Sequence, residues 1–216
     1  AYAKADIVQP DSVGLITLSV NVLYAYANGV FEALAGFGGG GSYLNNLTVQ
    51  ADYKAYSEAY TGSGTLDVAA ASVATNVAYA ETGTIVNVGL TGGKLDYRGS
   101  ADLVIEADGA GKANAGVRAA AVELTLIKVA ANVVIAKLTA EQNVFIQDTD
   151  IVTSKNVSVL STYNKNSDNT KLTPCGAVAT IESPDMAASL AGIQINSATA
   201  ITDAKVRAFT RASSIK

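Results

Sequence analysis

The clearest pattern in the chain is a strict alternation of apolar and polar positions. Leu47, Val49, Ala51, Tyr53 and Ala55 form the apolar set, and the positions between them are polar or tyrosine. A period of two is typical of a β-strand that buries one face. The segment at its start occurs three times, so we expect equivalent strands beginning in the ranges 46–51, 102–107 and 156–161.

A longer apolar segment follows each of these strands and is also repeated. The chain reads LSVNVLYA around Asn21, VATNVAYA around Asn76 and VAANVVIA around Asn132. Taken alone, the copy in 122–148 could be a buried helix, because it is long and apolar and contains no Gly or Pro. The other two copies alternate and are rich in β-branched residues, so strand is the interpretation that all three allow. We therefore expect no helix longer than two turns.

The repeat predicts an all-β fold, a right-handed parallel β-helix (β-solenoid) built from repeats of about 55 residues. No unit has enough large side chains for a core of its own, so neighbouring units must share one. One repeat can form one wide turn or two or three ordinary ones. An immunoglobulin-like sandwich array is the alternative, and four Phe are too few for its core. The approximate units are 1–43 (partial), 44–99, 100–154 and 155–216 (irregular).

Asn21, Asn76 and Asn132 are the candidate structural residues of this fold. Equivalent amides on successive turns of a solenoid can stack and hydrogen-bond as a ladder. In the irregular last unit no Asn falls near position 188, where the period would place one. The glycine-rich range 36–41 is expected to be a loop between units.

Composition and charge exclude several classes of function. The formal net charge is −4, which argues against nucleic acid as a partner. The lone Cys175 cannot close an intrachain disulfide. No apolar run reaches the roughly 18 residues of a membrane span, so we expect no membrane insertion. The first residues already resemble the middle of a repeat, and we expect the chain to be a segment of a longer protein.

The residue inventory also predicts no enzyme, no cofactor and no metal site. The chain has no His, so Ser-His-Asp and Cys-His sites cannot form, and one Cys cannot hold zinc. Two acidic groups have the oxygen ligands that calcium prefers, but their spacing resembles no calcium loop and favours solvated side chains. These groups are Asp148 with Asp150, and Asp102 with Glu106 and Asp108.

Tyrosines are the remaining candidate surface residues. Tyr53, Tyr56 and Tyr60 lie close together in one alternating run, and Tyr79 and Tyr97 are further candidates later in the chain. If exposed, they would form a strip that binds sugar or protein, whereas ordinary packing on the sheet is the plainer interpretation. Glu58 lies between Tyr56 and Tyr60, and an acid beside aromatics is the arrangement with which some β-helix enzymes cleave polysaccharide.

The repeats resemble those of very large secreted bacterial exoproteins. The shared pattern is V-x-V-x-A with a polar alternating run, then an Ala/Val segment, then an acidic turn such as Ile146-Gln147-Asp148. Similar repeats occur in filamentous haemagglutinin-like adhesins and in the leukotoxin-type filamentous adhesins of fusobacteria and their relatives, and the resemblance covers about 13–209. It implies an extracellular β-helical stalk that is secreted through an outer-membrane partner and presents adhesive or toxic segments at the cell surface. These families define no catalytic residues.

Three functions follow as hypotheses. The first is a structural or adhesive stalk segment that binds a host-cell or neighbouring-cell surface protein or glycan without catalysis. The second is a self-assembling extracellular filament or surface-layer subunit, which would self-associate through its coil ends. The third is a polysaccharide-active β-helix enzyme, which would carry clustered acids beside aromatics on one face.

Overall fold

The computed structural model is all β and shows thirteen strands and no helix among the residues that it describes. These residues are 1–9, 11–39, 41–62, 66–119, 122–166, 168–173, 175–183 and 186–216. The segment 122–148, which alone could pass for a helix, is a strand from Val122 to Gln147. The interpretation drawn from its repeated copies is therefore confirmed.

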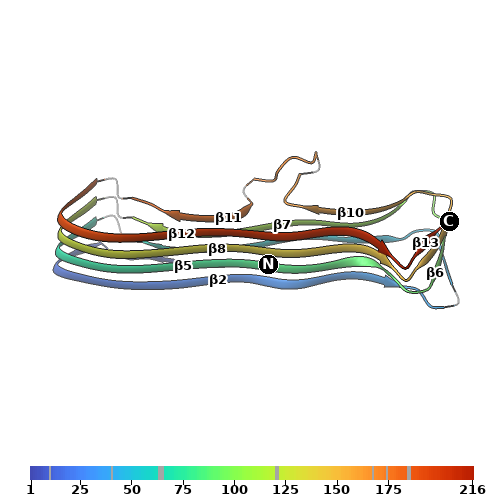
Figure 1. The fold of residues 1–216 in the computed structure, drawn as a ribbon, viewed down its shortest axis with the longest axis horizontal. Helices are drawn as coiled ribbons and strands as arrows, with labels where there is room; N and C mark the ends of the chain where they lie inside the picture. The colour runs from blue at the N-terminus through green and yellow to red at the C-terminus, as the bar shows by residue number, and fades with distance from the viewer. Residues whose placement is uncertain are drawn as a thin grey trace.

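Four long strands form the first sheet, called here the long sheet. They lie side by side in the order β12-β8-β5-β2, and every neighbouring pair is parallel (Figure 1). Because each strand runs for 25 or 26 residues, the molecule is far longer than it is wide. The bounds are β2 (Ser12–Gly36), β5 (Leu66–Thr91), β8 (Val122–Gln147) and β12 (Met186–Arg211).

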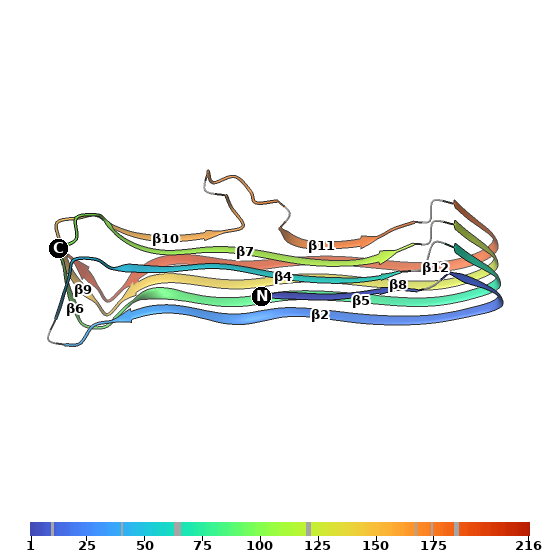
Figure 2. The same ribbon diagram turned by 180° about the vertical axis from the view of Figure 1, so that it is seen from behind.

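Two further parallel sheets complete the fold. The opposite sheet lies behind the long sheet and contains β1 (Tyr2–Val8), β4 (Thr48–Gly62), β7 (Leu103–Arg118), β10 (Val157–Tyr163) and β11 (Gly176–Ile181) (Figure 2). The short end sheet contains β3 (Ser42–Leu44), β6 (Lys94–Tyr97), β9 (Asp150–Thr153) and β13 (Ser214–Ile215). The chain visits long, end and opposite sheets in this order again and again, as in a β-solenoid. Its parallel pairing does not fit an immunoglobulin-like sandwich, whose strands are antiparallel.

The register follows the repeat predicted from sequence in the first three copies. Asn21 pairs with Asn76, and Asn76 pairs with Asn132. In the opposite sheet Thr48 pairs with Val104, which agrees with the alignment of 46–51 on 102–107. Residues that occupy the same register position in successive strands are called a column below.

An insertion between β10 and β11 makes the last unit irregular. β10 and β11 both pair with β7, and the described residues between Tyr163 and Gly176 leave the sheet as an excursion (Figure 1). Within it Lys165 and Lys171 form an antiparallel bridge. The insertion lengthens this passage, so the next Asn of the column is Asn196, 64 residues after Asn132. This insertion is the reason that no Asn falls near position 188, where the period alone would place one.

The glycine-rich range 36–41 lies at a corner of the solenoid. β2 ends at Gly36, and the chain then turns from the long sheet into the end sheet at β3. Gly92 and Gly93 make the same corner one coil later, with φ of 71° and 78°, and Asp148 makes it in the next coil with φ of 53°. This corner connects β2 and β3, which are consecutive strands of one coil. Gly40 lies outside the described residues.

The core lies between the long and opposite sheets and changes in character along their length. In the middle it consists mainly of alanines, such as Ala80 and Ala136 facing Ala59 and Ala115. Such small side chains let the two sheets pack closely. Toward the end sheet the core is built from larger residues, including Val86, Leu90, Leu95, Ile105 and Ile146.

Candidate binding surfaces

The three asparagines expected to stack do lie in one column, and Asn196 extends it to four. Asn21 Nδ2 donates to Asn76 Oδ1 at 2.8 Å, Asn76 Nδ2 to Asn132 Oδ1 at 2.9 Å, and Asn132 Nδ2 to Asn196 Oδ1 at 2.8 Å. The first three side chains are buried. The ladder therefore lies in the interior, and every step of it runs in the same direction along the solenoid.

Tyr53 was a candidate for surface binding and is instead buried, with 7% of its surface exposed. Its hydroxyl donates to Gln142 Oε1 at 3.0 Å, and Gln142 Nε2 donates to the Ala107 carbonyl at 2.9 Å. Burial raises the pKa of Tyr53 to about 12, because the phenolate would lose its hydration. The prediction of an exposed Tyr53 was therefore wrong. The alternation already placed Tyr53 in the apolar set, so the sequence pattern itself indicated that this side chain is buried.

The ring of Tyr53 explains why the next strand carries glycine. Tyr53 pairs with Gly109 in the register, and a Cβ on Gly109 would collide with the Tyr53 ring. Tyr163 approaches from the other side and would collide with a Cβ on Gly111. The rings of Tyr53 and Tyr163 lie 6.3 Å apart and fill the space that the two glycines leave.

Tyr56 and Tyr60 lie on the outer face of the opposite sheet, half-buried among charged groups. The Arg118 guanidinium lies 4.6 Å above the Tyr60 ring. Between the two tyrosines, Glu58 accepts from Lys112 Nζ at 2.9 Å and from the Tyr2 hydroxyl at 3.2 Å. The hydrogen bond from Lys112 holds the pKa of Glu58 below its usual value. This part of the surface is an ion-paired face in which the tyrosine rings are partly covered.

The acidic candidates do not converge on one point. Asp102 accepts from the Asn156 backbone N–H and side-chain amide at 3.2 and 3.1 Å, and so joins two coils. Asp108 lies beside Asp52 in the register, and burial together with that charge raises the pKa of Asp108. Across the described part of the chain, no group of three or more His, Cys, Asp or Glu is placed to hold a metal ion.

The most exposed aromatic cluster lies on the outer face of the long sheet, and the sequence prediction named only one of its members, Tyr79. The rings of Tyr24 and Tyr26 are stacked, with centroids 6.1 Å apart and planes 8° apart. Tyr79 from β5 lies 5.8 and 5.5 Å from them. Tyr24 and Tyr26 are 54% and 52% exposed. Alternation outward from the buried Asn21 would have found them, because it places both on the outer face.

This cluster, the tyrosine platform, is anchored by polar side chains beside it on the same face. The Tyr79 hydroxyl donates to Glu81 at 2.6 Å, and this bond raises the pKa of Tyr79 to about 12. Lys137 Nζ reaches the other Glu81 oxygen at 3.2 Å. The rings thus come from β2 and β5, and Lys137 of β8 holds the Glu81 that anchors Tyr79.

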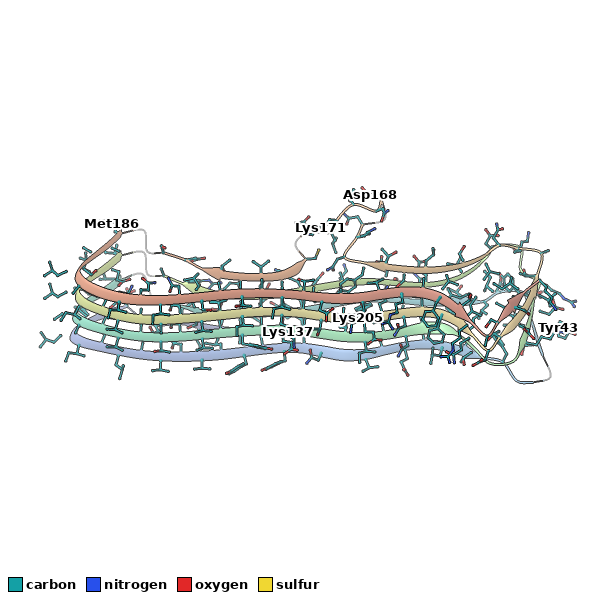
Figure 3. All side chains as sticks on the ribbon, viewed as in Figure 1. Tyr43, Lys137, Asp168, Lys171, Met186 and Lys205 are labelled. Atoms are coloured by element: carbon teal, nitrogen blue, oxygen red, sulfur yellow. The ribbon has the colours of Figure 1, made fainter. Side chains whose placement is uncertain are left out.

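A shallow groove of about 660 Å³ lies beside the tyrosine platform and crosses all four strands of the long sheet. Its floor is the column Asn28, Gly83, Thr139 and Asp203. Gly83 has no side chain to fill the floor. Glu81 lines the side nearer the platform, and Glu141 and Lys205 line the other. Figure 3 shows Lys137 and Lys205 on this sheet, well away from the excursion that carries Asp168 and Lys171.

On the other side of the tyrosine platform the long sheet is apolar. The pairing is interrupted at the same position in all four strands here, since Leu15, Ala70, Leu126 and Leu190 have no partner in the register. The alternation shifts at this interruption, so that neighbouring residues such as Leu126 and Ile127 are both exposed. Leu15 and Leu190 are 82% and 85% exposed. The residues of this apolar face are Leu15, Ile16, Leu18, Val20, Leu126, Ile127, Val129, Leu190, Ile193 and Ile195.

Comparison with family models, with curated proteins and with solved structures found no match for this chain. The described residues include no helix with the length and hydrophobicity of a membrane span. The resemblance to secreted filamentous adhesins therefore stays a prediction from the sequence.

Proposed function

We propose that the chain is a segment of a right-handed β-solenoid in which one turn takes about 55 residues, and that it serves as a structural and adhesive stalk segment of a secreted bacterial surface protein. It acts by binding through its surface, without catalysis. Its partner is a protein or glycan on a host cell or a neighbouring cell.

The outer face of the long sheet is the observation that carries this proposal. It combines an apolar face, the tyrosine platform and a groove lined by Glu81, Glu141 and Lys205. Contiguous exposed apolar surface is unusual on a soluble protein and marks interaction sites. Tyrosines that are apolar on their faces and polar at their tips are well suited to bind both sugar rings and proteins.

The parallel sheets make this face rigid and extended. Each column of the face is repeated in four strands, so a ligand can contact equivalent positions in successive coils. Binding on such a surface is shallow and gains its strength from several contacts at once. These properties are those of a stalk that adheres along its length.

The polysaccharide-active alternative would need two carboxylates on either side of one sugar bond. Glu58 pairs with Asn114, which lies eight positions from Glu106 along β7. At about 3.3 Å per residue these two carboxylates are roughly 26 Å apart, whereas glycosidases hold theirs about 5 to 9.5 Å apart. The ion pair with Lys112 also keeps Glu58 ionised, which does not suit a general acid.

The test is adhesion of the fluorescently labelled chain to cultured epithelial cells and to a printed array of mammalian and bacterial glycans. We expect the double substitution Tyr24→Ser with Tyr26→Ser to weaken binding by about tenfold, because it removes the stacked aromatic surface. Tyr43→Ser is the matched control, since Tyr43 is 71% exposed on the end sheet and far from the platform.

Binding that the control and the double substitution weaken equally would contradict the proposal, as would no binding above background to any cell or glycan. Release of reducing ends from acidic polysaccharides, lost on Glu58→Gln, would favour the enzyme instead.

A further inference from the structure

The two outermost strands of the long sheet have complementary edges. Among the described residues β2 pairs only with β5, and β12 pairs only with β8. In Figure 1 they form the lower and upper borders of the long sheet. Every residue of β12 except Phe209 is exposed, including those that point toward the interior. A long unpaired edge of this kind is a template for another parallel strand.

We propose that the 216-residue chain by itself stacks head to tail on a second copy, with β2 of the second copy parallel to β12 of the first and in the register that the coils already use. Asn196 of one copy then lies beside Asn21 of the next. In this arrangement β1 of the second copy lies on β11 of the first, and its β3 lies on β13.

The asparagine ladder supplies the direction and the register of the contact. Every step donates from Nδ2 to the Oδ1 of the following coil. At the last coil, Asn196 Oδ1 already accepts from Asn132, and the described residues offer its Nδ2 no acceptor. At the first coil, the described residues offer the acceptor Asn21 Oδ1 only a 3.5 Å contact from Gln9 Nε2. The donor at one end of the molecule therefore matches the acceptor at the other, and stacking adds one further step to the ladder.

The outer charges agree with the same register. Glu32, Asn87, Asn143 and Arg207 occupy one column. Stacking therefore brings Arg207 of one copy beside Glu32 of the next. Opposite charges directly across a strand pair already occur in this sheet, where Lys137 and Glu81 lie 3.2 Å apart. No like charges meet elsewhere in the long sheet, because Asp203 comes to face Asn28 and Lys205 comes to face Val30.

The inner side chains are complementary in size. Small residues of β12 face larger ones of β2, as Ala198 faces Leu23 and Val206 faces Phe31. In the opposite sheet Ala177, Ala179 and Ile181 of β11 continue the columns of Ala3, Ala5 and Ile7 of β1. Stacking thus buries apolar interior surface that the last coil leaves exposed.

β1 of the second copy covers β11 of the first and does not reach the excursion. The excursion leaves the opposite sheet between Tyr163 and Gly176. β1 begins at Tyr2, and the column of Tyr2 is that of Gly176. The stretch of β10 and the base of the excursion are therefore not covered by β1 of the second copy.

Sedimentation velocity of the 216-residue chain across a wide concentration range, with negative-stain electron microscopy of the largest species, tests the proposal. We expect dimers and longer straight rods that grow with concentration along the solenoid axis. Asn196→Asp should weaken association at least about a hundredfold, because it replaces the donor by a carboxylate that stacking would bury against Asn21 Oδ1. The monomer tolerates this change, because Asn196 is exposed there and still accepts from Asn132. Asn46→Asp, an exposed site outside the contact, is the matched control for charge.

A charge exchange tests the register. Arg207→Glu and Glu32→Arg should each weaken association several-fold, and the double substitution should restore it, since the two charges meet again across the contact. A chain that stays monomeric at all concentrations would overturn the proposal. Oligomers that Asn196→Asp leaves unchanged would also overturn it and would place the contact elsewhere, with the apolar face as the next candidate.

Discussion

Removal of one amide from the middle of the asparagine ladder should destabilise the fold far more than removal of an equivalent amide from the surface. Asn76 is the informative position, because it accepts from Asn21 at 2.8 Å and donates to Asn132 at 2.9 Å. Asn76→Ala therefore leaves Asn21 Nδ2 and Asn132 Oδ1 without a partner. Both side chains are buried, with 8% and 6% of their surface exposed, so water cannot replace the lost contacts.

The expected loss of stability follows from the two buried groups that lose their hydrogen-bond partners. A buried donor or acceptor that loses its partner costs about 1 to 3 kcal/mol, so Asn76→Ala should lower the free energy of unfolding by about 2 to 6 kcal/mol. Asn87→Ala, in the same strand, is the matched control. Asn87 donates to Glu32 at 3.3 Å and accepts from Asn143 at 3.2 Å, but it is half-buried on the outer face. Water can replace its contacts, and we expect a loss below about 1 kcal/mol.

Urea unfolding followed by circular dichroism measures both variants. The two free energies of unfolding are compared only if both variants keep the same slope of free energy against urea concentration, because an equal slope means that both unfolding reactions expose the same surface. Equal losses in the two variants would refute the reasoning, because burial of the amides would then not decide their contribution.

Two further predictions concern the core and the outer charges. Gly109→Ala should lower the free energy of unfolding by at least about 2 kcal/mol, because its Cβ collides with the Tyr53 ring, and the addition of Tyr53→Leu should recover part of this loss. Gly14→Ala, where nothing lies closer than 3.8 Å to the new Cβ, is the control and should be nearly neutral in the same urea assay. Because Lys112 lowers the pKa of Glu58, its ionised form stabilises the fold above the usual carboxyl pKa, and this contribution is lost as the pH falls through the lowered pKa. Glu58→Gln should therefore lower the urea midpoint at pH 7, and in acid its midpoint should equal that of the unsubstituted chain. Glu106→Gln, the control, should change the midpoint little at either pH. A lowered midpoint of Glu58→Gln that persists in acid would contradict the linkage.

The sequence alone determined which residues form strands and which face of each strand is buried. Its alternation places Tyr53 inside and Tyr24 and Tyr26 outside, because successive side chains of a strand point to opposite faces. The recurrence of one motif around Asn21, Asn76 and Asn132 determined which strands are equivalent. Identical neighbours at each position also favoured a parallel stack, in which each amide meets its own copy.

Only the tertiary structure decided the contacts that depend on the passage of the chain between strands. The excursion between β10 and β11 shifts the last unit, so Asn196 follows Asn132 in the ladder at a sequence separation that no fixed period predicts. Gln142 bonds to Tyr53 and to Ala107 across the core, and the rings of Tyr53 and Tyr163 fill the space over glycines of β7. The interruption of the pairing at Leu15 and Leu126 exposes adjacent apolar residues that simple alternation would divide between the two faces. These contacts join residues far apart in the chain, and the pattern within a strand fixes its faces but not the residues that another sheet or coil brings against them.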